Sequence, residues 1–152
     1  MSIDVRTQDG ITEVLLNHPP VNALDSHGWF ELADKVRAIG RDPASRVVLL
    51  AAEGRGFCAG VDIKELARDG KLITQVNRGC YEAFAAIYEC EVPVISAVHG
   101  FCLGGGIGMA GASDIVLTRR DAERVGLDPG ALNYLGSART ANGSVTARFV
   151  KQ

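Results

Sequence analysis

Residues 55–66 read Arg-Gly-Phe-Cys-Ala-Gly-Val-Asp-Ile-Lys-Glu-Leu, and residues 100–111 read Gly-Phe-Cys-Leu-Gly-Gly-Gly-Ile-Gly-Met-Ala-Gly. Each stretch follows an apolar run rich in β-branched residues, at 47–50 and at 94–98. A strand that passes through a tight glycine turn into a helix leaves backbone N–H groups without intrahelical partners, at the positive end of the helix dipole. We therefore predict that the two stretches converge and that their main-chain donors hold an oxyanion.

The bulk properties are those of an ordinary globular protein. A chain of 152 residues suits one domain with a real core, and 47% hydrophobic with 22% charged residues is a common balance. A net charge of −2 offers no basic field for nucleic acid and no polybasic anchor for a membrane. The apolar runs are strand-length, and the first residues do not resemble a secretory signal, so we expect a cytoplasmic protein with no nucleic-acid or membrane partner.

The four cysteines, at positions 58, 80, 90 and 102, form no C-x-x-C pair and have no histidine at ligand spacing. We interpret them as small buried hydrophobic residues and predict no metal site. Metal binding or a thiolate nucleophile is the lesser alternative.

The pattern of apolar residues predicts strands that alternate with helices. Asp9-Gly10 between two alternating runs predicts a hairpin. Asp25 or Ser26 can cap a helix that ends at Asp42-Pro43. Its apolar face consists of Trp29, Leu32, Ala33, Val36 and Ile39.

Further along, residues 47–52 predict a buried strand and residues 63–67 a short helix. Val76, Cys80, Ala83, Phe84 and Ile87 fall on one face of a longer helix. Strands follow at 94–98 and 114–117. This alternation predicts an α/β fold with helices packed over a sheet.

The character of the sequence changes after residue 117. Residues 118–152 are rich in arginine, glycine and alanine and carry no periodic apolar stripe. We therefore predict a core at 1–117 and a divergent, loosely ordered tail at 118–152.

The second glycine stretch has two other interpretations. Gly106, Gly108 and Gly111 fit G-x-G-x-x-G, the dinucleotide fingerprint, but a strand-like run begins at Asp114 and leaves no room for the crossover helix. Alternatively, the glycines only allow a helix to pack closely on a sheet. We favour the oxyanion interpretation because the first stretch shows the same pattern of a strand, a glycine turn and a helix start.

Together the two stretches resemble the crotonase (enoyl-CoA hydratase/isomerase) superfamily. Residues 57–65 resemble its F-x-A-G-x-D-[IL]-x-E motif, residues 98–106 its V-x-G-x-x-x-G-G-G motif, and residues 17–24 its N-x-P-x-x-N-A-[LM] entry. The resemblance implies a ββα superhelix, of which this chain carries the N-terminal core. It also implies assembly as trimers or pairs of trimers, acyl-CoA substrates, and no cofactor apart from the coenzyme A of the substrate.

The resemblance assigns roles to single residues. The backbone N–H groups of Val61 and Gly105 are expected to bind the thioester oxygen and stabilise an enolate. Ala59 and the turn Asp62-Ile63-Lys64 are expected to line the coenzyme A channel. Lys64 either meets a phosphate or is a solvated surface lysine, and Asp62 is better explained as a charge in the first turn of a helix.

Two departures from the family pattern bear on the reaction. Hydratases carry one glutamate at the position of Gly108 and a second in an F-G-x-P-E-like stretch. Residues 125–129 are the segment of this chain that is most similar to that stretch. Residues 77–81, 88–90 and 104–108 resemble a subgroup that acts on ring-containing CoA esters in steroid degradation and is similar to ring-opening C–C hydrolases. There, a glycine at 108 is expected to leave room for a cyclic acyl group.

Family members are considerably longer, and their C-terminal half supplies the second acid and the covering helices. We hypothesise that residues 118–152 arise from a frameshift or gene remnant. Three functions follow: a crotonase-type acyl-CoA enzyme, either hydratase-like or a ring-opening C–C hydrolase; a truncated relative that binds CoA esters without turnover; or a subunit that joins a full-length paralogue.

Overall fold

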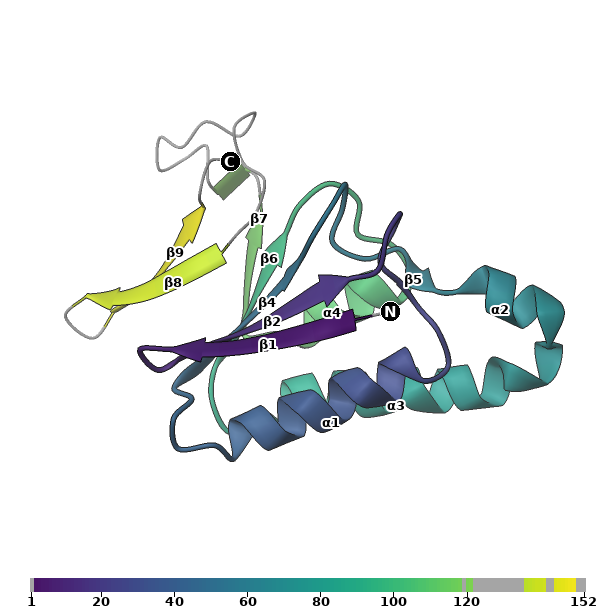
Figure 1. Cartoon of the computed structure of the whole chain (residues 1–152), viewed down its shortest axis with the longest axis horizontal. Coiled ribbons are helices and arrows are strands. Elements are labelled where there is room, and N and C mark those ends of the chain that lie inside the picture. Colours follow the sequence, from purple (N-terminus) through teal and green to yellow (C-terminus); the bar gives the residue numbers. More distant parts are fainter. Residues whose placement is uncertain (1, 119, 122–135, 142–143, 150–152) are drawn as a thin grey trace.

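The computed structural model describes residues 2–118, 120–121, 136–141 and 144–149, and it has the predicted mixed α/β architecture. Its main sheet has five strands in the order β1-β2-β4-β6-β7 (Figure 1). β1 runs antiparallel to β2, and the other neighbours are parallel. The strands are β1 (Ser2–Gln8), β2 (Ile11–Asn17), β4 (Val47–Ala52), β6 (Val94–Val98) and β7 (Ile115–Thr118).

The predicted hairpin is formed by β1 and β2. Asp9 and Gly10 both have positive φ, 53° and 82°, as a two-residue turn that matches the twist of its strands requires. The turn sets the register that pairs Gln8 with Ile11.

Two long helices cover one face of the sheet. α1 (Gly28–Gly40) and α3 (Ile73–Tyr88) lie side by side beneath the strands in Figure 1. Gly79 of α3 allows this approach, because a Cβ there would lie 2.8 Å from Cβ of Trp29. The main core lies between these helices and the sheet, and all five residues of the predicted apolar face of α1 belong to it.

The opposite face of the sheet is also apolar. Its buried residues are Ile11, Leu15, Val47, Leu49, Ala51, Ile95 and Ala97. The hairpin of β8 (Gly136–Ala141) and β9 (Ser144–Phe149) contacts β2 and β4, so chain beyond residue 117 reaches this sheet. The division of the chain at residue 117 stays a prediction.

The remaining elements carry the glycine stretches. β3 (Ala23–Leu24) and β5 (Gly60–Val61) form a small parallel sheet that the sequence pattern did not predict. α2 (Ile63–Arg68) and a 3-10 turn (Gly70–Leu72) follow β5, and α4 (Gly105–Ala112) follows the second glycine stretch. Within the described residues, no helix has the length and apolar character needed to cross a membrane.

Candidate functional site

The two glycine stretches lie against each other. The N–H of Phe57 donates to the carbonyls of His99 and Phe101, at 2.9 Å each, and the N–H of Leu103 donates to Cys58 O at 2.9 Å. Cys58 also forms a parallel β-bridge with Cys102. Segments far apart in the sequence are therefore joined through main-chain hydrogen bonds.

Glycine is required where the two backbones touch. A Cβ on Gly60, whose φ is +91°, would lie 2.9 Å from Gly105 N and 3.0 Å from Leu103 O. A Cβ on Gly106 would lie 2.5 Å from Cys58 O. These approaches leave no space for side chains, and they bring β5 directly against the first residue of α4.

Each stretch leaves one amide directed away from its own element. Asp62 N donates to Leu24 O at 2.8 Å, and successive amides of a strand point to opposite sides, so the Val61 N–H points away from β3. Gly105 opens α4, so its N–H has no intrahelical acceptor. The Val61 N–H thus belongs to a strand and not, as predicted, to the start of a helix.

Gly105 is packed against a tryptophan. A Cβ on Gly105 would lie 2.5 Å from Cη2 and 2.7 Å from Cζ2 of Trp29. The ring edge of Trp29 therefore leaves no space for a side chain at position 105. Trp29 was predicted only as part of a core face, and its complete burial confirms that prediction.

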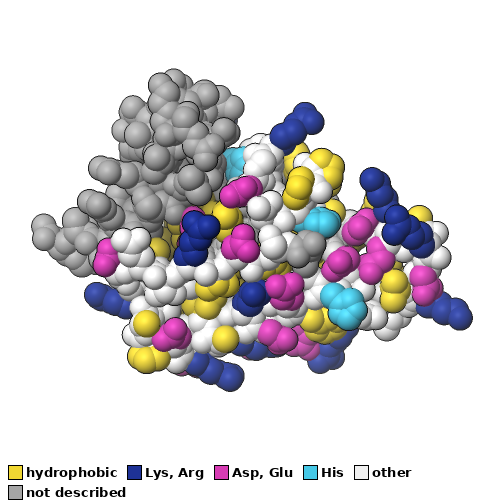
Figure 2. Space-filling model, in the orientation of Figure 1, with side chains coloured by type: hydrophobic (Ala, Val, Ile, Leu, Met, Phe, Trp, Pro, Cys, Tyr) yellow, Lys and Arg dark blue, Asp and Glu magenta, His cyan; other side chains and the backbone are white. Residues whose placement is uncertain are grey.

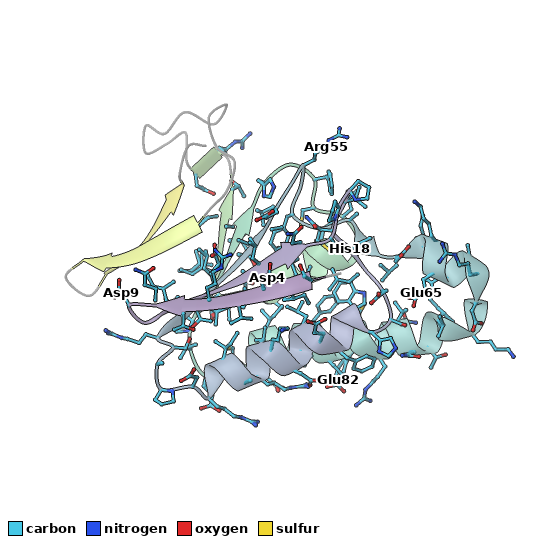
Figure 3. The ribbon with its side chains drawn as sticks, viewed as in Figure 1. Asp4, Asp9, His18, Arg55, Glu65 and Glu82 are labelled. Carbon is cyan, nitrogen blue, oxygen red and sulfur yellow. The ribbon has the colours of Figure 1, made fainter. Side chains whose placement is uncertain are left out.

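Asp62 and Glu65 anchor the start of α2. Oδ1 of Asp62 accepts from the N–H groups of Lys64 and Glu65 at 2.9 and 3.3 Å, so the expected first-turn charge is an N-cap. The carboxylate of Glu65 (Figure 3) accepts from the N–H and Oγ of Ser26, at 2.7 and 2.8 Å. The N-cap position of α1 is His27, so neither Asp25 nor Ser26 is the N-cap that was predicted. Asp25 nevertheless accepts from the N–H of Gly28, the first residue of α1, at 2.7 Å.

The other residues assigned to the coenzyme A channel differ in their exposure to solvent. Ala59 is half-buried, and its N–H donates to Val21 O at 3.0 Å. Ile63 is 72% exposed, and Lys64 is exposed as well. Their contact with coenzyme A stays a prediction.

On the face shown in Figure 2, acidic and basic side chains are interspersed.

The structure corrects the expectation that Gly108 leaves room for a substrate ring. A Cβ at this position would collide with the ring of Phe84, so an aromatic side chain of α3 already fills the space. Gly106, Gly108 and Gly111 all lie inside α4, whereas the first glycine of a dinucleotide fingerprint forms the turn between strand and helix. The stretch 125–129, compared above with the second acid motif, lies outside the described residues.

The cysteines have the environment of packing residues. All four are free, Cys58 is buried, and the others are half-buried. Burial raises the pKa of Cys58 to about 12 and that of Cys80 to about 11, which disfavours a thiolate. Among the described residues, no group of histidine, cysteine, aspartate and glutamate could hold a metal ion.

The comparisons with known proteins agree on one family. Residues 6–133 match Enoyl-CoA hydratase/isomerase, a match that runs past residue 117. The (7aS)-7a-methyl-1,5-dioxo-2,3,5,6,7,7a-hexahydro-1H-indene-carboxyl-CoA hydrolase of Rhodococcus jostii is 59% identical over 116 residues, 75% of this chain and 45% of that protein. Its counterpart from Mycobacterium tuberculosis is 54% identical over 117 residues, 76% of this chain and 47% of that protein.

Solved structures agree with the sequence matches. An enoyl-CoA hydratase from Mycobacterium avium subsp. paratuberculosis superposes with a TM-score of 0.69 at 29% identity, over 76% of this chain and 46% of that one. The predicted crotonase-like fold is therefore confirmed for the N-terminal core. The chain spans about half the length of the curated relatives it matches.

Proposed function

Because the chain belongs to the enoyl-CoA hydratase/isomerase family, we propose that it binds an acyl-CoA thioester with the carbonyl oxygen between the N–H groups of Val61 and Gly105. The observation that carries this proposal is the close approach of Gly60, which directly precedes Val61, to the backbone of Gly105.

The neighbourhood of the two amides suits an acyl group. Ile63 lies two residues after Val61, and Leu103 and Ile107 flank Gly105 at the same spacing. These three apolar side chains are 72%, 54% and 59% exposed. Exposed apolar side chains beside paired amide donors fit a thioester whose oxygen accepts hydrogen bonds while its acyl chain contacts hydrocarbon.

The amides would stabilise negative charge on the thioester oxygen. When a bond at the α-carbon breaks and leaves its electron pair there, the pair delocalises onto this oxygen as an enolate. Fixed N–H donors lower the energy of that enolate more than the energy of the neutral thioester, which is the condition for catalysis.

For the substrate class we propose a cyclic acyl-CoA with a ring ketone β to the thioester, as an extension of the two hydrolases similar to this chain. Water adds to the ketone, the bond between that carbon and the α-carbon breaks, and the electron pair moves onto the thioester as the enolate. Protonation of the α-carbon then gives a carboxylic acid and a ring-opened thioester. Hydratase or isomerase chemistry is the alternative within the family.

A second candidate function is binding without turnover, alone or beside a longer paralogue. It is favoured by the glycine at position 108, where hydratases carry an acid. Without an acid and a base, the oxyanion donors would polarise a thioester without completing a reaction. Trimeric assembly likewise stays a proposal, which sedimentation can test.

The test uses acetoacetyl-CoA, whose enolate absorbs in the near ultraviolet more strongly than its keto form. Val61→Pro removes the donor N–H, whereas Val61→Ala keeps the donor and changes only the side chain. Because this N–H points away from β3, the substitution costs no hydrogen bond between β3 and β5. We expect the enolate fraction to fall about 10²-fold in Val61→Pro and to change little in Val61→Ala.

The proposal is wrong if Val61→Pro, with an unchanged circular dichroism spectrum, supports enolate formation as well as Val61→Ala does. Turnover of a cyclic β-ketoacyl-CoA then separates the two candidates. Release of a carboxylic acid supports the hydrolase, and an enolate band without product supports binding alone.

A further inference from the structure

Trp29 packs against Gly105 and is linked to Val61 through β3. It is the single tryptophan of the chain, it belongs to the first turn of α1, and it is completely buried. Its indole nitrogen donates to Leu24 of β3, the strand that pairs with β5, and the edge of its ring contacts Gly105.

The first contact runs toward Val61. Nε1–H of Trp29 donates to Leu24 O at 3.1 Å, and the same carbonyl accepts from Asp62 N at 2.8 Å. Asp62 follows Val61 directly, so this shared acceptor ties the indole to the peptide that adjoins the first donor.

The second contact is with Gly105. Cη2 and Cζ2 of Trp29 lie 2.5 and 2.7 Å from where a Cβ of Gly105 would stand, so the ring edge abuts the first residue of α4. A larger residue at 105 would push α4 away from the ring, and a smaller one at 29 would let it move inward.

The indole itself has little freedom. The ring of Phe84 meets it edge-on, with centroids 5.8 Å apart and planes at 83°. Its Cβ lies over Gly79 of α3, where a side chain would come within 2.8 Å. A buried ring held by an aromatic neighbour and by a hydrogen bond is a rigid spacer.

We propose that Trp29 is a positioning residue that sets the spacing between the N–H groups of Val61 and Gly105. The inference rests on the proposed function, because the spacing matters only if both amides bind one oxygen. Hydrogen-bond donors act on an enolate only within a narrow distance range, and a misplacement of about 1 Å can cost 10²-fold in rate.

The test compares Trp29→Phe with Phe30→Leu in the enolate assay with acetoacetyl-CoA. Trp29→Phe removes the Nε1–H donor and shortens the ring, whereas Phe30→Leu loosens the packing of α1 on Gly79 of α3. We expect the enolate fraction to fall about tenfold in Trp29→Phe, with the Kd for the thioester changed less than about threefold. Phe30→Leu should lower the stability and leave the enolate fraction unchanged.

A double variant tests spacing against general damage. Gly105→Ala alone drives its methyl group into the indole and should abolish the enolate band. Trp29→Phe relieves that collision, so Gly105→Ala with Trp29→Phe should recover part of the band. Recovery is a non-additive effect that independent losses of stability would not produce.

The wild type provides a further readout, which does not require a variant to fold. Addition of acetoacetyl-CoA should shift the tryptophan emission, because the thioester binds beside Gly105, and free coenzyme A should shift it less. The inference fails if the emission does not respond, or if folded Trp29→Phe forms the enolate like wild type while Val61→Pro does not. If Val61→Pro also forms it normally, the proposed function fails as well.

Discussion

At the scale of single residues, α4 contains two glycines in opposite situations. A methyl group on Gly108 would collide with the ring of Phe84, whereas one on Gly111 would meet no atom within 4 Å. We expect Gly108→Ala to destabilise the protein by about 1–3 kcal/mol through overpacking. Gly111→Ala should be neutral or stabilise it by about 0.5–1 kcal/mol, because alanine is the better helix former. Urea unfolding of both variants measures the difference, and equal effects would contradict the packing at Gly108.

A second prediction concerns Glu13 on β2. Its Oε1 is buried and accepts no hydrogen bond among the described residues. Burial raises the pKa of this carboxyl, Arg6 opposes the shift, and Glu53 adds to it. The folded state therefore keeps the proton on Glu13 up to a higher pH than the unfolded chain does. The contribution of this group to the free energy of unfolding is fully present at low pH, and it is lost as the pH rises through the raised pKa.

The corresponding variant is Glu13→Gln, which cannot ionise. Its stability relative to wild type should increase as the pH rises above about 4, the ordinary pKa of a glutamate, because the wild-type carboxylate then forms. Urea unfolding at several pH values measures this, with exposed Glu89→Gln as the control. A constant difference between Glu13→Gln and wild type across this range would show that Glu13 is not destabilised by its charge.

At the scale of elements, α2 is the least anchored helix. None of its six residues is fully buried, so it depends on the Asp62 cap and on the hydrogen bonds between Glu65 and Ser26. Asp62→Ala should cost about 1 kcal/mol, and amide hydrogen exchange in α2 should accelerate about fivefold. Asp62→Asn keeps a capping oxygen and should behave like wild type.

The same pair of variants tests the assignment of Asp62 to the coenzyme A channel. If the carboxylate acts only as a cap, Asp62→Asn should bind acetoacetyl-CoA with an unchanged Kd. A loss of affinity in Asp62→Asn without faster exchange in α2 would instead indicate a direct role of the charge in binding.

At the scale of the whole molecule, the chain leaves apolar side chains exposed around the proposed site and along β7. Besides Ile63, Leu103 and Ile107, these include Ile115 at 48% and Val116 at 41% exposure. Exposed apolar side chains bind hydrophobic dyes. We expect native protein to enhance the fluorescence of 8-anilinonaphthalene-1-sulfonate and Ile107→Gln to reduce the enhancement. Val5→Gln on β1 is the control, and an equal reduction there would contradict a localised surface.

Much of this architecture could be predicted from the sequence, because its signals are local and periodic. The Asp9-Gly10 turn, the apolar face of α1 and the continuous apolar run of β4 each identify their own element. β3 and β5 escaped prediction because strands of two residues have no period to detect, and they hold their place through partners distant in sequence.

The candidate site was predictable only in part. The glycine pattern predicted that the two stretches converge, and their close backbone contact confirms this. The assignment of the donors to Val61 and Gly105 came from the family resemblance and stays a prediction. The space beside Gly108 was misjudged because the residue that fills it, Phe84, lies on another helix. The contacts of Trp29 could not be foreseen either, since periodicity places a residue on a face and does not name the atoms opposite.

The pairing of the two glycine stretches also bears on the order in which the molecule folds. Val61 and Gly105 are about forty-four residues apart, whereas the β1–β2 hairpin closes through a two-residue turn. A hairpin forms within about 1–10 μs, but contacts between distant segments must first overcome a larger loss of chain entropy. We therefore expect the two glycine stretches to meet after the β1–β2 hairpin has formed, and tryptophan emission in a refolding experiment to report this late step.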